Sequence, residues 1–350
     1  MILTDKRIVI TGGTGSLGKT LVHRILSGEL GTPRKVIVFS RDEAKQHDMR
    51  ISYLSKSVVT DEVIYRNFMS ILEMRIADVR DYANVCSVLK DADIVFNAAS
   101  MKQVPTCEYF PVQALQTNCL GAYNIARAIE ENSYPVDTVV GISTDKACKP
   151  VNVMGMTKSI QERIFIAANI MIPKTRFICV RYGNVLASRG SVIPLFQEQI
   201  RNGGPVTITV AEMTRFLLSL DQAVDTVLAA VRWADPGDTY IPGAPSATVL
   251  NIARALIGDR KIETVATGIR PGEKIHEILV SEEEAYRCFK QGDYYTIRPM
   301  LPELRREGDL LGPCLDKEFS SAHASLNYEN TVELLRKHNL LSDETETRSY

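Results

Sequence analysis

The stretch Arg7-Ile-Val-Ile-Thr-Gly-Gly-Thr-Gly-Ser-Leu-Gly18 decides the fold of this 350-residue chain. A short apolar strand comes first, glycines recur at 12, 15 and 18, and an amphipathic helical stretch follows. Such a loop lets a pyrophosphate settle on the helix N-terminus, because the chain turns tightly and no Cβ obstructs the approach. A tight turn without a ligand is the alternative, which the strand–loop–helix context disfavours. We therefore predict a dinucleotide site with contacts from Gly12, Thr14, Gly15, Ser16, Leu17 and Gly18.

Short β-branched runs alternate with helix-period stretches through the first 180 residues. Strands that are apolar throughout and joined by helices indicate a parallel sheet buried on both faces. We therefore expect an α/β fold with a doubly wound parallel sheet of the Rossmann type. The expected strands are 7–11, 35–39, 73–77, 93–97, 136–142 and 176–181, and the expected helices are 17–27, 81–89, 112–131 and 154–170.

The rhythm of the sequence changes after about residue 183, where Gly-Pro and Pro-Gly pairs divide the chain into shorter elements. We expect residues 1–183 to form the dinucleotide-binding domain. Residues 184–306 should form mainly a smaller substrate lobe, with some chain returning to the sheet, and 307–350 a C-terminal extension. Within that extension, 307–320 should be loop, 330–341 a last helix, and the final residues a polar, disordered tail.

Composition excludes several classes of protein. The 41 Lys and Arg residues nearly balance 42 Asp and Glu, which argues against a general nucleic-acid binder. Seven scattered cysteines without a C-x-x-C pair, beside five histidines, support neither a disulfide framework nor a metal site. The longest apolar run, 164–172, is too short to span a bilayer, and the first residues lack a signal-peptide core. We expect a cytoplasmic enzyme or binding domain without nucleic-acid or membrane partners.

The end of the second strand distinguishes the two nicotinamide cofactors. An acidic residue there binds a ribose 2′-OH, whereas a basic residue accommodates a 2′-phosphate. Ser40, Arg41 and Lys45 suit a phosphate, so the sequence predicts NADP. NAD is the alternative, because Asp42 could turn towards a ribose instead of completing the first turn of the next helix.

Further cofactor contacts follow the third and fourth strands. Asp78 and Val79 stand where an adenine is usually held, although Asp78 could equally cap the next helix. Small residues after the fourth strand let a nicotinamide lie close. The expected contacts from this region and beyond it are Ala98, Ala99, Ser100, Asn118 and Tyr182.

Reactive side chains follow the fifth strand as Thr144-Asp145-Lys146, and Met154 and Lys158 share one face of the next helix. Ligands of open parallel sheets bind beyond the carboxyl ends of the strands. A carboxylate beside an ammonium offers both a base and an acid. A surface ion pair is the alternative for Asp145 and Lys146, but their position after this strand favours catalysis.

These residues resemble the extended, nucleotide-sugar-modifying branch of the short-chain dehydrogenase/reductase superfamily. That superfamily normally carries Tyr-x-x-x-Lys, whereas this chain has Met154-Gly-Met-Thr-Lys158. A thioether neither accepts nor donates a proton at relevant pH. Either another group performs the proton transfers, or the chain is a catalytically inactive NADP-binding regulator.

Within the branch, the chain is most similar to bacterial polysaccharide-biosynthesis UDP-N-acetylglucosamine (UDP-GlcNAc) 4,6-dehydratases, in which methionine also replaces this tyrosine. The resemblance implies oxidation at C4, loss of water across C5 and C6, and hydride return to C6, giving a UDP-4-keto-6-deoxy sugar. Its C5-inverting members match better than the retaining ones. The segments that carry the resemblance are 102–109, 143–147, 180–185, 188–194, 213–216 and 270–274.

The resemblance also assigns roles to residues. Lys146 would act at C5 and Asp145 at O6, with O4 as a second candidate. Thr144 would bind O4, and Lys158 would hold the nicotinamide ribose. Lys102 is a lesser candidate for the sugar site. The expected UDP contacts are Asn184, Ser191, Val192, Pro194, Arg215, Arg270 and Glu273, the arginines because their planar guanidinium groups match phosphate oxygens.

Two further expectations concern specificity and assembly. A UDP-sugar C4 epimerase is the alternative enzyme, since it shares the hydride step but not the elimination. The long helix after Phe110-Pro111 could pair with a second copy, so we expect a homo-oligomer, either a dimer or a larger assembly such as a hexamer. Although the net charge is near zero, we expect six basic residues to face the cofactor and the UDP-sugar. They are Arg41, Lys102, Lys146, Lys158, Arg215 and Arg270.

Overall fold

A nine-stranded sheet forms the centre of the computed structural model, which describes residues 1–55, 62–186, 191–305 and 314–341. Its seven strands from β10 to β3 are parallel, and β15 and β14 add an antiparallel edge, so the predicted doubly wound sheet is confirmed. The strand order is β14 (Cys288–Gln291), β15 (Tyr294–Ile297), β10 (Thr239–Pro242), β6 (Arg176–Val180), β5 (Thr138–Ile142), β4 (Ile94–Asn97), β1 (Arg7–Thr11), β2 (Lys35–Ser40) and β3 (Leu72–Ile76).

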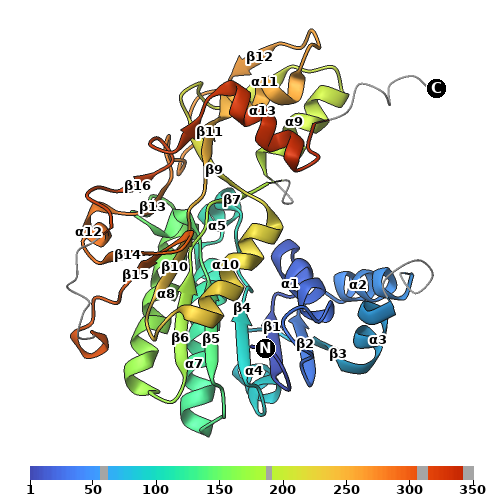
Figure 1. Cartoon of the computed structure of the whole chain (residues 1–350), viewed down its shortest axis with the longest axis vertical. Helices are drawn as coiled ribbons and strands as arrows, with labels where there is room; N and C mark the ends of the chain where they lie inside the picture. The colour runs from blue at the N-terminus through green and yellow to red at the C-terminus, as the bar shows by residue number, and fades with distance from the viewer. Residues whose placement is uncertain (56–61, 187–190, 306–313, 342–350) are drawn as a thin grey trace.

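Helices cover both faces of this sheet (Figure 1). Alternate residues of each strand point to opposite faces, so Ile8 and Ile10 belong to one buried cluster and Val9 to another. One face packs against α1 (Ser16–Leu26), α2 (Glu43–Ser55), α3 (Glu62–Ile71) and α10 (Leu220–Trp233). The other packs against α4 (Tyr82–Leu89), α7 (Gly121–Asn132) and α8 (Val153–Met171).

The helix expected over 112–131 is divided. It comprises α6 (Pro111–Leu115), a π-helical turn (Gln116–Leu120) and α7, and α5 (Val104–Tyr109) precedes them. The other predicted elements of the first 181 residues are present, with ends shifted by no more than two residues. Among the described residues, no helix is long and apolar enough to cross a bilayer, and no His, Cys, Asp and Glu side chains cluster as metal ligands would.

A smaller lobe lies beyond the carboxyl ends of the parallel strands (Figure 1). Its four-stranded sheet has the order β17 (Ser325–Leu326), β11 (Ser246–Thr248), β9 (Thr214–Leu218) and β7 (Asn184–Val185). This lobe has its own apolar core, built from α9 (Val192–Arg201), α11 (Val249–Ile257) and α13 (Tyr328–Lys337). The last helix expected over 330–341 corresponds to α13, whereas the predicted tail at 342–350 lies outside the described residues.

Two small strand pairs complete the lobe and its connection to the sheet. They are β8 (Val206–Ile208) with β12 (Thr264–Ala266), and β13 (Ile278–Val280) with β16 (Phe319–Ser320). Chain from both sides of residue 306 therefore builds the lobe, while β10, β14 and β15 return to the main sheet. Of the loop expected over 307–320, residues 307–313 lie outside the described part.

A buried cluster of ionised groups joins β13 to the main sheet. Arg181, directly after β6, donates to Glu162 on α8 and to Glu284 on α12 (Glu282–Ala285), each at 2.7 Å. Its guanidinium also donates to the Leu279 carbonyl oxygen of β13 at 2.8 Å. One side chain thus ties together the sixth strand, a sheet-covering helix and the segment that enters the site described below.

Candidate active site

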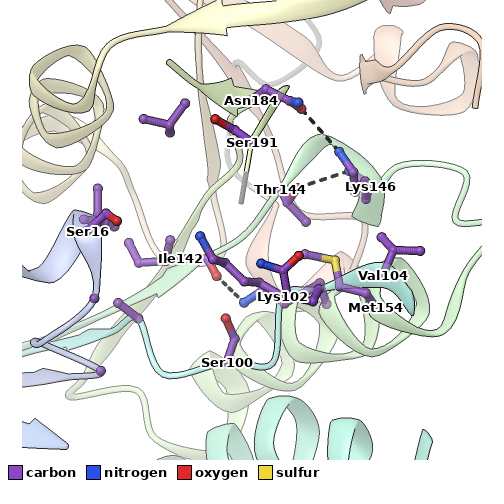
Figure 2. A pocket seen from close by; sticks show the side chains of 18 of the residues that line it. Ser16, Ser100, Lys102, Val104, Ile142, Thr144, Lys146, Met154, Asn184 and Ser191 are labelled. Carbon is purple, nitrogen blue, oxygen red and sulfur yellow. Dashed lines mark hydrogen bonds between the residues drawn. The ribbon is translucent and has the colours of Figure 1, made fainter. Parts of the chain in front are cut away.

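A cavity of about 1310 Å³ lies between the carboxyl ends of the parallel strands and the lobe. Its lining includes every residue predicted for cofactor, sugar or UDP binding and catalysis except Asn118 and Asp145. Figure 2 shows the part of this cavity around Thr144, Lys146 and Met154. The sequence motifs, which are spread over the 262 positions from Gly12 to Glu273, therefore converge on one cavity.

The glycine loop has the geometry that a bound pyrophosphate requires. Gly12 has a φ of +66°, and a Cβ added there would lie 2.7 Å from the Ala99 nitrogen. A Cβ on Gly18 would lie 2.5 Å from the Gly13 Cα, so only glycine lets α1 begin this close to the loop. Backbone approach of this kind leaves room for a phosphate at the helix N-terminus. The cradle therefore fits a dinucleotide.

The end of β2 presents cations to the cavity. The Arg41 side chain is 55% exposed and its guanidinium lies 3.6 Å from the Asp78 carboxylate. Lys45 forms an ion pair with Asp42, whose carboxylate also accepts from the Lys45 backbone N–H at 3.0 Å. The Asp42 carboxylate is thereby engaged at the start of α2, in agreement with its assignment to the first turn of a helix.

Asp78 does not cap a helix. Its carboxylate accepts from the Arg80 side chain and backbone, and both Arg80 and Arg41 hold the pKa of Asp78 below its usual value against the opposing effect of burial. The cap of α4 is Asp81, which accepts from the Asn84 backbone N–H at 3.1 Å. Asp78 lines the cavity, so it is available to the adenosine end of a cofactor.

Asn118 lies behind the cavity wall. It is fully buried and lies outside the cavity lining. Its amide accepts from the Met101 N–H at 2.8 Å and donates to the Met101 carbonyl oxygen at 3.1 Å and to Thr157 at 2.9 Å. Asn118 thereby fixes the loop after β4, which carries Ala98 to Ser100, against α8.

The ammonium of Lys146 stands at the centre of a polar cluster. Its Nζ lies 3.1 Å from Asp145 Oδ1, 3.1 Å from Glu277 Oε1 and 3.4 Å from Asn184 Oδ1. Figure 2 shows the Lys146 side chain beside Thr144 and bonded to Asn184. Burial lowers the pKa of Lys146, but the two carboxylates more than offset this effect and hold the pKa above its usual value. Lys146 is therefore a cation at rest.

Asp145 lies behind the cavity wall, with no exposed surface. Its Oδ1 accepts from the Thr144 hydroxyl at 2.9 Å and from Lys146, whereas its Oδ2 is buried without a partner among the described residues. Burial raises the pKa of Asp145. This carboxylate reaches a ligand only through Thr144 and Lys146, both of which line the cavity.

Lys158 and Met154 occupy adjacent turns of α8 on the cofactor side. Lys158 donates to the Ile142 carbonyl oxygen and, at 2.6 Å, to Gln161, and burial lowers its pKa to about 8. Met154 is 7% exposed and packs with Val104 and the buried Cys107. The methionine thus extends an apolar wall at the position where the superfamily places its tyrosine (Figure 2).

The lobe supplies two buried polar atoms to the cavity wall that have no hydrogen-bond partner among the described residues. They are the Ser191 hydroxyl oxygen and Glu273 Oε2. Buried polar atoms are nearly always paired in folded proteins, so such groups point to a polar ligand. Arg215 lies deep in the site and donates to the Thr214 and Ile275 carbonyl oxygens, while Arg270 is exposed at the rim. Of the segment 188–194, which carries part of the family resemblance, residues 188–190 lie outside the described part of the chain.

Many residues of the cavity lining were not predicted from the sequence, Lys19 and Glu277 among them. Lys19 on α1 lines the cofactor end, and Glu277, immediately before β13, lines the sugar end. Glu277 follows the Arg270–Lys274 motif by three residues, but an isolated glutamate before an apolar strand carries no catalytic signal.

A Rossmann sheet with a glycine-rich phosphate loop, a reactive lysine after β5 and a lobe closing over the site together define an extended short-chain dehydrogenase/reductase-type enzyme that modifies nucleotide sugars. The chain belongs to the polysaccharide biosynthesis protein family, whose family model matches residues 8–299.

Comparisons with individual proteins agree with this membership. The chain is 41% identical over 344 residues to a UDP-glucose 4-epimerase of Rickettsia bellii, covering 95% of this chain and 96% of the relative. Its fold matches Pen from Bacillus thuringiensis with a TM-score of 0.86 at 31% identity, covering 97% and 100% of the two chains. A dTDP-glucose 4,6-dehydratase from Streptomyces venezuelae, solved with NAD, shares the fold at 17% identity, with a TM-score of 0.65 over 77% of this chain and 86% of that one.

Affinity for the nicotinamide cofactor should depend on the absence of a side chain at position 12 of the glycine loop. We expect Gly12→Ala to weaken cofactor binding about tenfold or more, since a strained residue with positive φ costs about 1–3 kcal/mol and its Cβ meets Ala99. Titration of the protein with reduced cofactor, followed by fluorescence, measures the affinity. Gly28→Ala is the matched control, because Gly28 has a φ of +80° but no atom within 4 Å of the added Cβ. Equal losses of affinity in the two variants would contradict the prediction.

Proposed function

We propose that the protein is an NADP-dependent UDP-GlcNAc 4,6-dehydratase that makes a UDP-4-keto-6-deoxy sugar for bacterial glycan biosynthesis. The Lys146 cluster supports this proposal, because the Lys146 ammonium and the Glu277 carboxylate line the cavity while the Asp145 carboxylate lies against the same ammonium behind the wall. Elimination of water requires groups that move protons at C5 and O6, whereas exchange of a hydride at C4 alone requires none there. Both ligands are water-soluble nucleotides, which suits a cytoplasmic enzyme.

The proposed cofactor site uses residues from the first part of the chain. The glycine loop would hold the pyrophosphate, Asp78 and Val79 the adenine, and Lys158 the nicotinamide ribose. When bound, the cofactor supplies hydride acceptance at C4 and hydride return at C6. Lys158 in its cationic form would keep the nicotinamide oriented towards the sugar.

Proton transfer at O4 has a route that needs no tyrosine. The Thr144 hydroxyl lines the cavity and donates to Asp145 at 2.9 Å, so a proton leaving O4 can pass to Thr144 while the Thr144 proton moves to Asp145. The raised pKa of buried Asp145 makes it a better proton acceptor than an exposed aspartate. The proton stored on Asp145 is then available for O6 as water leaves, by the same hydroxyl.

Lys146 serves the C5 position in this proposal. Oxidation at C4 acidifies the C5 proton, and the amine form of Lys146 removes it and then passes it to solvent. Because Lys146 is an ammonium at rest, its reactive fraction grows as pH rises. We propose that a proton from solvent enters C5 from the face opposite Lys146, which inverts C5, as in the members of the family that the sequence resembles most.

The UDP moiety would occupy the lobe side of the cavity. Arg215 and Arg270 suit a diphosphate, and a ribose hydroxyl could donate to Glu273 Oε2, which has no partner in the part of the chain that the structure describes. Asn184, Ser191, Val192 and Pro194 line the remainder, where the uracil would lie, and Lys102 lines the cavity on the side of the sheet.

An epimerase is the second candidate, because the Rickettsia relatives are named UDP-glucose 4-epimerase. Epimerisation leaves the mass of the substrate unchanged, whereas dehydration removes one water. Mass spectrometry of UDP-GlcNAc incubated with protein and NADP therefore separates the two functions.

We expect a product lighter by one water, with deuterium at C5 when the reaction runs in deuterium oxide. Lys146→Ala should lower kcat by about 10²- to 10⁴-fold, the usual contribution of a positioned proton-transfer group. Lys149→Ala is the matched control, since Lys149 pairs with Glu318 outside this cavity. An unchanged mass, or full turnover by Lys146→Ala, would contradict the dehydratase assignment.

The preference for NADP over NAD follows from the cations after β2. Arg41→Ala should reduce kcat/KM for NADP about tenfold. The reason is that one hydrogen bond from a guanidinium to a charged phosphate stabilises the complex by roughly 1.5–3 kcal/mol. The kcat/KM for NAD should change little, and steady-state kinetics with both cofactors measures the difference. A parallel loss with NAD would assign Arg41 to another part of the cofactor.

We also propose a homo-oligomer of two or more copies. The segment from the end of α5 to the first turn of α7 carries several apolar side chains that are about half exposed or more. Exposed apolar surface of this kind marks protein interfaces. These side chains belong to Tyr109, Phe110, Val112, Leu115, Leu120 and Tyr123.

Light scattering should therefore give a multiple of the 38.9 kDa chain mass. Leu115→Glu should shift the protein towards the mass of one chain, because a charge would become buried at the interface. Met69→Glu alters a still more exposed apolar residue on α3 and should leave the mass unchanged. A single-chain mass for the unaltered protein would refute the proposed assembly.

A further inference from the structure

Glu277 is the carboxylate of the Lys146 cluster that faces the cavity. It stands immediately before β13, and only 2% of its surface is exposed. Its Oε1 lies 3.1 Å from Lys146 Nζ, and its Oε2 is buried without a partner among the described residues. Glu277 lines the cavity, whereas Asp145, on the other side of the same ammonium, does not.

Three acceptors surround the Lys146 ammonium, which has three hydrogens to donate. Asp145 Oδ1 and Glu277 Oε1 lie at 3.1 Å, and Asn184 Oδ1 at 3.4 Å. These acceptors come from the loop after β5, from the segment before β13 and from β7. Because Asp145 lies behind the wall, only Glu277 and Asn184 hold the Nζ towards the cavity.

We infer that Glu277 is a positioning residue, which fixes Lys146 Nζ on the side of the cavity where C5 of the hexose would lie. This inference deepens the proposed function and rests on it for the identity of the reacting carbon. Loss of Glu277 would leave Lys146 with one carboxylate partner, Asp145, which lies behind the wall. Misplacement of a reacting group by about 1 Å can cost on the order of 10²-fold in rate.

Glu277 also sets the charge of Lys146. The charged groups that face this lysine are the carboxylates of Asp145 and Glu277 and the cations of Arg215 and Lys274. Without the Glu277 carboxylate, only Asp145 of these four groups would raise the pKa of Lys146, whereas the two cations and burial would lower it. The pKa of Lys146 must then fall, so the amine form becomes more abundant at every pH below that pKa.

Two variants separate position from charge. Glu277→Gln keeps the shape of the side chain and removes its charge, whereas Glu277→Asp keeps the charge and withdraws it by one methylene. Glu282→Gln is the matched control, because Glu282 is exposed on α12 and does not line the cavity.

The first measurement needs no substrate. The protein is treated with a small acylating reagent between pH 7 and 10, and the initial rate at Lys146, which is proportional to its amine fraction, is read by peptide mass spectrometry. We expect Glu277→Gln to acylate faster by a factor on the order of 10 or more. Glu277→Asp and Glu282→Gln should match the unaltered protein. A rate in Glu277→Gln equal to that of the unaltered protein would overturn the inference.

The second measurement is the rate with UDP-GlcNAc and NADP. Divided by the amine fraction from acylation, kcat of Glu277→Gln should fall on the order of 10²-fold, with a far smaller change in KM. Glu277→Asp should recover part of this loss. An undiminished kcat per amine in Glu277→Gln would also overturn the inference, and so would a Glu277→Asp variant that acylates as fast as Glu277→Gln.

The two measurements keep this inference separate from the proposed function. If the unaltered protein turned over no UDP-sugar, the dehydratase proposal would fail while acylation still reported the coupling of Glu277 to Lys146. If Glu277→Gln failed to fold, the acylation rate and kcat of Glu277→Asp would decide. A Glu277→Asp variant with both values unchanged would show that Lys146 does not depend on the place of this carboxylate.

Discussion

The buried hydrogen bonds of Arg181 connect the segments of chain that build the active site. This buried guanidinium joins β6 to Glu162 and Glu284 and binds the Leu279 carbonyl oxygen, two residues beyond Glu277. Removal of its charge would strand two carboxylates in the interior, at a cost of about 3–5 kcal/mol. The hydrogen bond to Leu279 also fixes the position of β13 relative to β6. The distance between Glu277 and Lys146, and with it the charge of the lysine, therefore depends on an ion cluster outside the cavity.

The sheet could be predicted from the sequence because its central parallel strands are mostly apolar on both faces and are separated by recognisable turns and helices. β1 and the glycine loop are the clearest case, since a residue other than glycine at position 12 or 18 would collide with backbone. The start of α2 was predicted at Asp42, but its extent and the whole of α3 were not. The apolar positions of α2 are few, and its helical state depends on packing of Met49 and Tyr53 against the sheet. The π-helical turn after α6 has no local signal either.

The site was predictable wherever a residue follows a strand of the parallel sheet, since the carboxyl ends of such strands meet at one edge. Thr144 and Lys146 were found in this way. Glu277 was not, because its role depends on tertiary contacts with a residue 131 positions earlier. Asp145 and Asn118 are the two predicted site residues that are fully buried and lie outside the cavity lining, and burial of this kind depends on tertiary packing that the sequence motifs do not show.

The order of the chain has a consequence for biosynthesis. Lys146 and the glycine loop leave the ribosome well before Glu277, and domains of growing chains fold from the N-terminus onwards. Until β13 docks on Arg181, the lysine has one carboxylate partner instead of two. The nucleotide-binding half can therefore assemble early, while the reactive amine acquires its final protonation equilibrium only when the late segment arrives. Completion of folding and completion of the electrostatic field around Lys146 are the same event.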